Sequence, residues 1–326
     1  MPNWCCNRLC VSGRSEDIGQ VRALFAGGGY PSYARAAAEG VQLFLAGCAG
    51  ILRPADGEHY APYPALTGAK GYPSCAEEGR DGHHDVSGNQ AFTQWLCCLR
   101  EGTVLTDAAC DDLHALWLES GLHALWLESG LRDRRWNDLT PARQECIVAV
   151  FAGQRHDWCG SFSATTVQTW WDTVCDGLPE LKAQPLDLLM VLPPRLDVEI
   201  NGYNGRLLAG VPDGFSDTTE RCGTKWPYAH DLNISWSDAT SLDADFDTPW
   251  SPPSAAVLSA LSARYGVTVE HWYAEAGADY CGYALYSDGE QAEACCDSLE
   301  WSEDEDGGRE VTGPAWIVDN VASFGG

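Results

Sequence analysis

The segment Leu242-Asp-Ala-Asp-Phe-Asp-Thr248, followed by Pro249-Trp-Ser-Pro-Pro253, decides the fold of this chain. In the first segment Leu242, Ala244 and Phe246 alternate with acidic residues, so a β-strand places the two kinds of side chain on opposite faces. One face is therefore apolar and the other is anionic. This pattern is typical of an antiparallel sheet that other elements cover on one side only.

The residues that flank this strand predict a β-β-α-β-β order. Proline is favoured at the first helical position and glycine just beyond the last, so Pro252-Pro253 and Gly266 are expected to bound a helix. Apolar residues recur at helical spacing between them. The expected elements are strands at 232–238 and 242–248, a helix at 254–265, and strands at 267–274 and 280–286 joined by a turn at 275–279.

The N-terminal segment predicts one strand and one helix. Residues 3–11 have the pattern of a strand, and Ser15 with two acidic residues behind it is typical of a helix start. The helix is expected to end at the glycines 27–29. These glycines follow a helix and lack a Gly-Lys-Ser/Thr sequence, so they do not predict a phosphate loop.

The middle of the chain is expected to be mainly helical. Thr140-Pro141 is a helix start, since threonine suits the cap and proline the first helical position. The predicted segments are helices at 34–40, 91–100, 107–131, 141–152 and 165–175, an apolar segment at 41–46 and a loop at 57–88. Residues 196–200 and 206–211 flank Asn201-Gly-Tyr-Asn-Gly205, which favours a β-hairpin turn.

A nine-residue tandem duplication occupies residues 113–130: Leu113-His-Ala-Leu-Trp-Leu-Glu-Ser-Gly121 is repeated unchanged as residues 122–130. At about 100° per residue, the two copies point to opposite sides of one straight helix. Either Gly121 breaks the helix or both of its faces are buried. We interpret the repeat as a recent duplication tolerated in a peripheral insertion, and a paired Trp/His binding surface is the alternative.

Charge is the strongest feature of the composition. The chain carries a formal net charge of −27, and the residues from Asp213 onward hold 22 acidic and 4 basic residues, a net charge of −18. Such a surface repels nucleic acid, whose binding depends on basic contacts to phosphate. It favours basic partners, including proteins that themselves bind nucleic acid, and the alternative is a role in solubility.

The sequence predicts no metal, no cofactor and no catalytic residue. Fifteen cysteines occur without any Cys-x-x-Cys spacing, so most are expected to be reduced, buried thiols. The segment His83-His84-Asp85 has no further ligands at a recognisable spacing. The segment His156-Asp157-Trp158-Cys159 places a thiol near a base in sequence, which alone does not make a nucleophilic site.

Compartment and membrane association follow from what the sequence lacks. No apolar run reaches the roughly 18–20 residues that a membrane helix needs. The first residues have no signal-peptide pattern. We expect a soluble, cytoplasmic protein without membrane contact, and the sequence predicts no oligomeric state.

Three separated motifs resemble the Api92-like family of phage and plasmid proteins, which is also called DUF1281 or YubB-like and carries a ferredoxin-like domain. The motifs cover about the first 30 residues and about 220–290. The resemblance implies a mobile-element origin and an α+β fold, and it implies no activity. The first motif is Met1-Pro-Asn-Trp-Cys-x-Asn-x-Leu9 and the second is Gly223-Thr-Lys-Trp226. The third is Phe246-x-Thr-x-Trp250-Ser-Pro-Pro253 together with Tyr273-x-Glu275-x-Gly277 and Gly282.

The fold class that follows is α+β, with a ferredoxin-like antiparallel sheet that has helices on one face and a large, mainly helical insertion. The N-terminal strand and helix supply the first half of a β-α-β-β-α-β unit, so this strand must pair within the C-terminal sheet. The expected parts are the first strand and helix at 1–29, the insertion at 30–219, and the rest of the ferredoxin-like domain with an acidic C-terminal segment at 220–326.

Two classes of function remain. The first is a non-enzymatic protein whose acidic face, formed by Asp243, Asp245 and Asp247, binds a basic host protein, with nucleic-acid mimicry against a host defence as its purpose. A solvated face suits these residues better than a metal site, since they are spaced about 6.5–7 Å apart along the strand. The second is a small-ligand binder or enzyme with a pocket between the sheet and the insertion. The residues proposed for that pocket are Lys225, Trp226, Trp250, His271, Tyr273 and Glu275.

Overall fold

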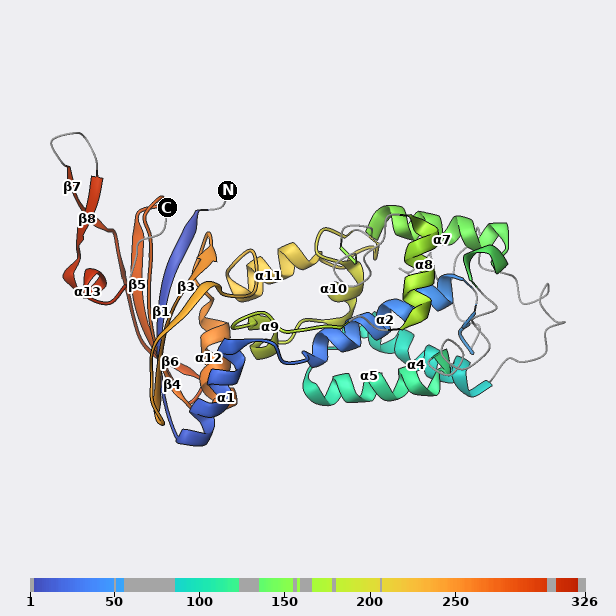
Figure 1. Ribbon diagram of the computed structural model, residues 1–326, viewed down its shortest axis with the longest axis horizontal. Coiled ribbons are helices and arrows are strands. Elements are labelled where there is room, and N and C mark those ends of the chain that lie inside the picture. Colours follow the sequence, from blue (N-terminus) through green and yellow to red (C-terminus); the bar gives the residue numbers. More distant parts are fainter. Residues whose placement is uncertain are drawn as a thin grey trace. The chain divides into compact units, whose positions relative to one another are not determined.

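The computed structural model describes residues 3–49, 51–55, 86–122, 135–154, 157–158, 166–177, 180–205, 207–303 and 309–321 (Figure 1). The chain folds as two compact units. The sheet unit comprises Met1–Gly29, Lys182–Leu192 and Phe215–Gly326, and the helical unit comprises Tyr30–Leu181 and Pro193–Gly214. Residues 182–192 thus belong to the sheet unit, although they fall within the predicted insertion.

The sheet unit is built on six strands in the order β2-β3-β1-β4-β5-β6. Every neighbouring pair is antiparallel. The first four strands of this order form a ferredoxin-like sheet, which confirms the predicted fold class, and β5 and β6 extend it. The strands are β1 (Trp4–Ser12), β2 (His230–Ser237), β3 (Ser241–Pro249), β4 (Thr268–Glu275), β5 (Tyr280–Ser287) and β6 (Glu290–Asp297).

The N-terminal strand β1 lies inside the sheet, paired with β3 on one side and β4 on the other, as the sequence predicted. Leu9, near the middle of β1, is opposite both Ala244 and His271, and no part of Leu9 is exposed. Leu242, Ala244 and Phe246 are buried on the same face, so the predicted alternation of β3 is also confirmed.

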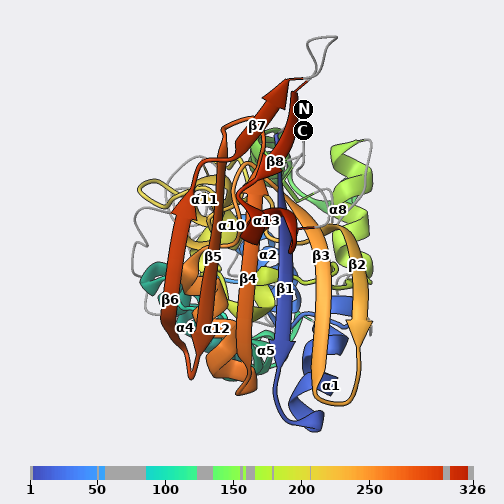
Figure 2. The same cartoon turned by 90° about the vertical axis from the view of Figure 1, so that its left-hand side faces the viewer.

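Helices cover one face of the sheet and a small C-terminal substructure lies over the other. Helices α1 (Ser15–Ala26) and α12 (Ala255–Tyr265) lie on the first face in Figure 1. The hairpin β7 (Glu300–Glu303) and β8 (Arg309–Gly313), followed by α13 (Ala315–Val318), lies in front of the opposite face in Figure 2. Two short helices complete the described part of this unit: α9 (Leu188–Val191), and α11 (Gly214–Cys222), which begins at the last residue of the helical unit.

Helix α12 begins one step later than the proline pattern predicted. Ser254 is its N-cap, and the Ser254 hydroxyl accepts a hydrogen bond from the Val257 N–H at 3.4 Å. Pro253 therefore precedes the cap instead of occupying the first helical position. Gly266 ends the helix in the left-handed conformation, with φ of 61°, as expected for a glycine at this place.

The described part of the helical unit packs around a core of large aromatic side chains, among them Phe44, Phe92, Trp95, Trp170 and Trp171. The helix and the apolar segment predicted at 34–46 form one helix, α2, because its alanine-rich start favours helix and its second half is buried on all sides. The described elements are α2 (Ser32–Cys48), α4 (Val86–Glu101), α5 (Asp107–Glu119), η2 (Trp136–Asp138), α7 (Pro141–Gln154), α8 (Val167–Asp176) and α10 (Leu196–Asn201).

The β-hairpin predicted at 196–211 is wrong, because residues 196–201 form helix α10. Short apolar runs do not distinguish a helix from a strand. The Asn201 side chain organises the following loop by donating to the carbonyls of Val211 and Pro212, both at 3.1 Å. The sequence left open whether Gly121 breaks the helix in the duplicated segment or whether both faces of one helix are buried. The structure shows a break, since α5 ends before Gly121, whose φ is 74°.

The second copy of the repeat beyond Leu122, most of the predicted loop at 57–88 and the segment His83-His84-Asp85 lie outside the described residues.

Removal of residues 1–12 is expected to unfold the sheet unit, because β1 supplies backbone hydrogen bonds to both β3 and β4. The measurement is urea denaturation of the full and shortened chains, followed by circular dichroism. A 220–326 fragment that unfolds cooperatively on its own would contradict the central role of β1.

A milder version of the same experiment uses two substitutions in strands. Leu9→Ala is expected to cost about 2–5 kcal/mol of unfolding free energy, because Leu9 is fully buried. The matched control is Ile234→Ala on the edge strand β2, where 37% of the side chain is exposed and the expected change is below about 1 kcal/mol.

Candidate functional site

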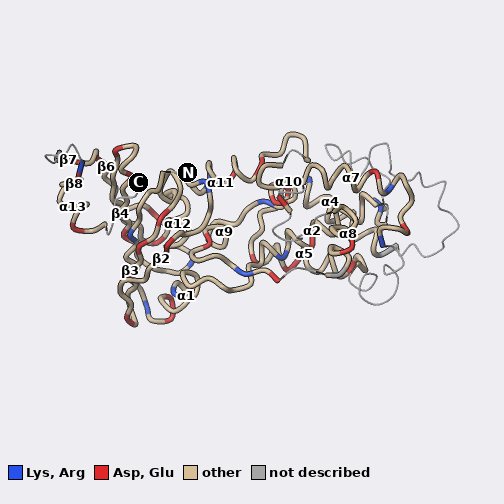
Figure 3. The backbone as a smooth tube through the Cα atoms, turned by 45° about the horizontal axis from the view of Figure 1, so that its top comes forward, with Lys and Arg blue, Asp and Glu red and all other residues tan. Residues whose placement is uncertain are grey.

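The face of the sheet opposite α1 and α12 carries most of the acidic side chains of the strands. One row across the sheet joins Asp243, Cys10, Glu270, Leu285 and Glu293, which follow from the strand registers. The acidic residues of the described part of the chain are red in Figure 3. We define the acidic face as the carboxylates that the registers place on this side: Asp243, Asp245, Asp247, Glu270, Glu293 and Asp297.

The three aspartates predicted as an interaction face are on this side, but they differ in their surroundings. Asp245 forms a bidentate ion pair with Arg8, with Nε–Oδ1 at 2.7 Å and Nη2–Oδ2 at 3.1 Å. Asp247 accepts a hydrogen bond from the Cys6 thiol at 3.1 Å, and burial raises the pKa of its carboxyl. Neither residue is an isolated surface charge, so the outward charge of the trio is smaller than the sequence suggests.

An aromatic cluster forms at the Trp4 end of the same face. The Trp4 ring lies 6.1 Å from the Trp226 ring and 4.7 Å from the His230 ring, measured between centroids. Tyr228 is 4.7 Å from His230 on its other side. Burial among these rings lowers the pKa of His230, so this histidine is neutral at physiological pH.

Lys225 sits between two tryptophans next to this cluster. Its Nζ is 5.1 Å from the centroid of Trp226 and 5.0 Å from that of Trp250, which is a cation–π arrangement. Trp250 has φ of 73° and is held by backbone hydrogen bonds, from its N–H to Asn3 O and from the Tyr280 hydroxyl to its carbonyl. Trp250 is therefore brought beside the consecutive residues Lys225 and Trp226, and these are three of the six residues that the sequence proposed for a pocket.

His271, Tyr273 and Glu275 lie elsewhere, on the side of β4 that is covered by helices. His271 is 1% exposed, and its Nε2–H donates to Asn7 Oδ1 at 3.0 Å. Asn7 uses its own amide hydrogens on the Cys5 carbonyl and on the Thr248 hydroxyl, which fixes its Oδ1 as the acceptor. Burial lowers the pKa of His271 to about 3, so this side chain is a neutral part of the core.

Glu275 and Tyr273 have structural tasks. The Glu275 carboxylate is 1% exposed and accepts the backbone N–H groups of Gly277 at 2.7 Å and Ala278 at 2.6 Å, so it closes the β4–β5 turn. The phenol of Tyr273 lies over Gly282, where a Cβ atom would overlap it. A Cβ atom at Gly277 would likewise lie 2.5 Å from Asn3 Nδ2 and 2.8 Å from Glu275 Oε1, so close approaches explain both glycines of this motif.

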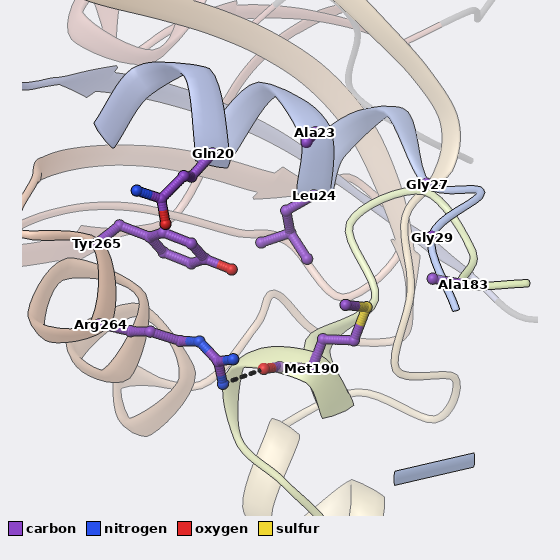
Figure 4. Close-up of a pocket in the computed structure, with 9 residues that line it drawn as sticks. All are labelled: Gln20, Ala23, Leu24, Gly27, Gly29, Ala183, Met190, Arg264 and Tyr265. Carbon is purple, nitrogen blue, oxygen red and sulfur yellow. Dashed lines mark hydrogen bonds between the residues drawn. The ribbon is translucent and has the colours of Figure 1, made fainter. Parts of the chain in front are cut away.

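A separate cavity of about 350 Å³ lies within the sheet unit, between α1, α9, α12 and the segments around Gly27 and Ala183 (Figure 4). None of the six residues predicted for a pocket lines it. Arg264 Nη1 donates to the Met190 carbonyl at its rim, at 2.7 Å. The lining residues are Gln20, Ala23, Leu24, Gly27, Gly29, Ala183, Met190, Arg264 and Tyr265.

Sequence reasoning missed Glu270, Glu293 and Asp297 as members of the acidic face, and it missed Arg8 as the partner of Asp245. Alternation along β1 and β4 places Arg8 and Glu270 on the polar side of their own strands, but only the pairing register brings them beside Asp245 and Asp243. The cavity had no sequence signal, because its lining comes from the ends of elements that are distant in sequence.

Cysteine burial agrees with the reading of the thiols as small core residues. Cys5, Cys48, Cys110 and Cys222 are not exposed, and burial raises the pKa of each thiol. Within the described residues, no three His, Cys, Asp or Glu side chains gather closely enough to hold a metal ion. No helix in the described part of the chain combines the length and apolarity that crossing a membrane requires.

The fold defines this chain as a ferredoxin-like α+β protein with an added helical unit. A family model described as a protein of unknown function (DUF1281) matches residues 30–226, and a second, described as the ferredoxin-like domain in Api92-like protein, matches residues 229–315. The chain belongs to this DUF1281 family, which confirms the resemblance seen in the sequence motifs.

Relatives extend this finding without adding a function. The uncharacterized protein YubB of Escherichia coli (strain K12) is 48% identical over 144 residues, which are 44% of this chain and 99% of YubB. The uncharacterized protein YubA of the same strain is 40% identical over 182 residues, which are 55% of this chain and 96% of YubA. The crystal structure of protein api92 from Yersinia pseudotuberculosis is similar with a TM-score of 0.76 at 28% identity, over 96% of this chain and 100% of that chain.

Stability is expected to fall with acid through His271. Its pKa is about 3 in the folded protein and near 6.5 when unfolded, so below pH ~6.5 the unfolded state binds a proton that the folded state does not. The loss begins near pH 6.5, grows as the pH falls and levels off below about pH 3, where it reaches on the order of 5 kcal/mol.

The measurement compares urea denaturation of the wild type and His271→Gln between pH 7 and pH 4. The carboxylates titrate equally in both proteins. The difference between the two plots of unfolding free energy against pH therefore reports the titration of His271 alone. We expect the variant to be less stable at pH 7, owing to imperfect packing, but to lose stability less steeply with acid. Parallel slopes would show that His271 is not a buried neutral group.

Proposed function

We propose that this protein is a non-enzymatic binding protein of a mobile genetic element, which uses its acidic face to bind a basic protein of the host cell. The observation that carries the proposal is the row formed by Asp243, Glu270 and Glu293 across β3, β4 and β6. Arg8 is the one basic side chain among the described residues that the strand registers place on this face. It is paired with Asp245. The surplus of negative charge attracts cations and steers their approach.

Aromatic side chains within the face support a cationic partner. Trp272 and Tyr283 lie between the acidic positions, with ring centroids 5.0 Å apart. Both are half-buried, and Trp272 packs in part against the apolar core of the C-terminal substructure. The aromatic cluster of Trp4, Trp226 and Tyr228 adds further ring surface at one end. A guanidinium or ammonium gains both from a carboxylate and from a ring face, so a surface that combines them suits arginine and lysine side chains.

A host protein that binds nucleic acid is the partner class we favour. Its basic site already matches a polyanion, so an acidic protein that occupies the site would block it, as a counter to host defence. The resemblance to phage and plasmid proteins supports this purpose. The polar residues of the alternative pocket have structural roles instead, since His271 is bonded to Asn7 and Glu275 closes a turn.

The test is capture of a partner from host lysate by the tagged protein, with washes at about 0.1 M and about 1 M salt, which screen exposed charges differently. We expect a basic protein to be retained at low salt and released at high salt. The triple variant Asp243→Asn, Glu270→Gln and Glu293→Gln is expected to lose most of this capture.

The control removes the same number of charges elsewhere, with Asp112→Asn, Glu119→Gln and Glu220→Gln, all at exposed positions. Asp245 and Asp247 are left unchanged because their partners Arg8 and Cys6 would lose a partly buried hydrogen bond. Equal capture by the two triple variants would contradict the assignment to the acidic face, and retention at high salt would contradict an electrostatic mode.

A small-ligand role is the second candidate, and the cavity beside Arg264 favours it. The lining is mainly apolar, through Ala23, Leu24 and Met190, and the guanidinium of Arg264 and the amide of Gln20 stand at its border (Figure 4). This combination suits a small amphipathic anion, because apolar surface binds the body of such a ligand and the guanidinium its charged group.

The test uses the amphipathic anion 1-anilinonaphthalene-8-sulfonate, whose fluorescence rises in apolar sites. We expect saturable binding that Ala23→Trp abolishes by filling the cavity and that Arg264→Gln weakens several-fold. Ala256→Trp is the matched control, since this alanine is equally exposed on the neighbouring helix α12 and lies outside the cavity lining. Similar fluorescence for both tryptophan variants would contradict a ligand site in this cavity.

A further inference from the structure

Strand β6 is the open edge of the sheet next to the acidic face. It pairs with β5 on one side, and within the described residues no strand pairs with its other side. All eight of its residues are exposed. In an antiparallel edge strand every second residue directs its N–H and C=O away from the sheet, so β6 offers a row of backbone groups for another strand.

The opposite edge of the sheet is built differently. Strand β2 carries Ile234 and Trp236 exposed, but its pairing with β3 shifts register twice along its length. Arg22 also binds the end of β2 and donates hydrogen bonds to the Ser237 hydroxyl and to the Asp238 carbonyl. Bulges and covered ends are ways of preventing strand addition, so β2 is protected by its geometry.

Strand β6 lacks that protection over most of its length. Its register with β5 is continuous from Cys281↔Asp297 to Leu285↔Glu293 and shifts only near the turn. Residues 292–296 hold small side chains except for Glu293, so they do not obstruct an approaching strand. Charge takes the place of geometry, because a second copy of β6 would bring its own Glu290, Glu293 and Asp297 close to these carboxylates, and like charges on neighbouring strands repel.

The same charges complement a basic strand. The chain holds no lysine or arginine between Arg264 and Arg309, so the edge has no basic residue of its own. A segment with Lys or Arg at every second position would pair its backbone with β6 and place its cations beside Glu293 and Asp297. Opposite charges on neighbouring strands stabilise a pair where like charges destabilise it.

We propose that β6 accepts an extended segment of a basic protein as an added strand of the sheet. The inference rests on the proposed function of the acidic face and names how its partner docks. Backbone hydrogen bonds hold the added strand, and the carboxylates of Glu290, Glu293 and Asp297 select the basic sequence. The occupant is a disordered tail or loop with alternating basic residues, which can become a strand on binding.

The experiment uses a synthetic peptide as long as β6, with arginine and valine alternating, titrated against the intact chain by fluorescence anisotropy. Two further peptides carry N-methyl groups, one on every arginine and one on every valine. In a strand, alternate N–H groups face opposite edges, so each peptide blocks one edge only. We expect one of them to lose more than about tenfold in affinity and the other to bind as the parent does, because only one edge of the added strand bonds to β6.

Charge reversal locates the site. The variant Glu290→Lys with Glu293→Lys is expected to weaken the parent peptide more than about tenfold and to bind a peptide in which glutamate replaces arginine. The control variant Asp112→Lys with Glu119→Lys makes the same charge change on the helical unit and should retain the parent affinity. Circular dichroism confirms that each variant is folded.

The outcomes separate the inference from the function on which it rests. Salt-sensitive binding that neither or both N-methylated peptides disturb would overturn strand addition and leave the acidic face as a binding surface. Selective loss with one peptide but no effect of charge reversal would move the site away from β6. Absence of salt-sensitive binding to the parent peptide would overturn both.

Discussion

The position of β1 between β3 and β4 is the constraint on which the sheet unit depends. Cys6 and Asp247 are hydrogen-bonded although 241 residues separate them in sequence. The sheet therefore cannot close until the chain beyond residue 240 is available. The cost of such a long connection grows only logarithmically with its length, about 0.6 kcal/mol for each doubling. A folded helical unit within the connection shortens the effective loop, so a large helical segment is compatible with a stable sheet.

Polar side chains in the core specify how these distant strands align. His271, Asn7 and Thr248 form one hydrogen-bonded chain across β4, β1 and β3, and the Thr248 hydroxyl continues it to the Ser251 carbonyl. A shift of one residue would turn every side chain to the other face and separate these partners. The apolar residues around them supply stability, whereas this network selects one register.

The sequence predicted the sheet unit well and its site only in part, for physical reasons. Period-two alternation in β3 and the helix signals before α12 depend only on neighbours in sequence, so both could be predicted from the sequence alone. The hairpin expected at 196–211 failed because a short apolar run suits either a strand or the buried helix α10. His271 and Glu275 were grouped in a pocket by residue type, and only their burial and partners show that they support the core and a turn. The ion pair of Arg8 and Asp245 depended on strand register, which alternation alone cannot give.

The two edges of the sheet show how an exposed strand can be kept from uncontrolled pairing in different ways. On β2 the exposed Ile234 and Trp236 would attract other strands, and bulges interrupt the ladder that such strands would need. On β6 the ladder is nearly regular and the side chains are small, so repulsion between carboxylates is the remaining barrier. A bulge hinders any added strand, whatever its charge. Repulsion between carboxylates excludes a second acidic strand but allows a basic one to pair. An edge guarded by charge is therefore also an edge that can recognise an oppositely charged partner.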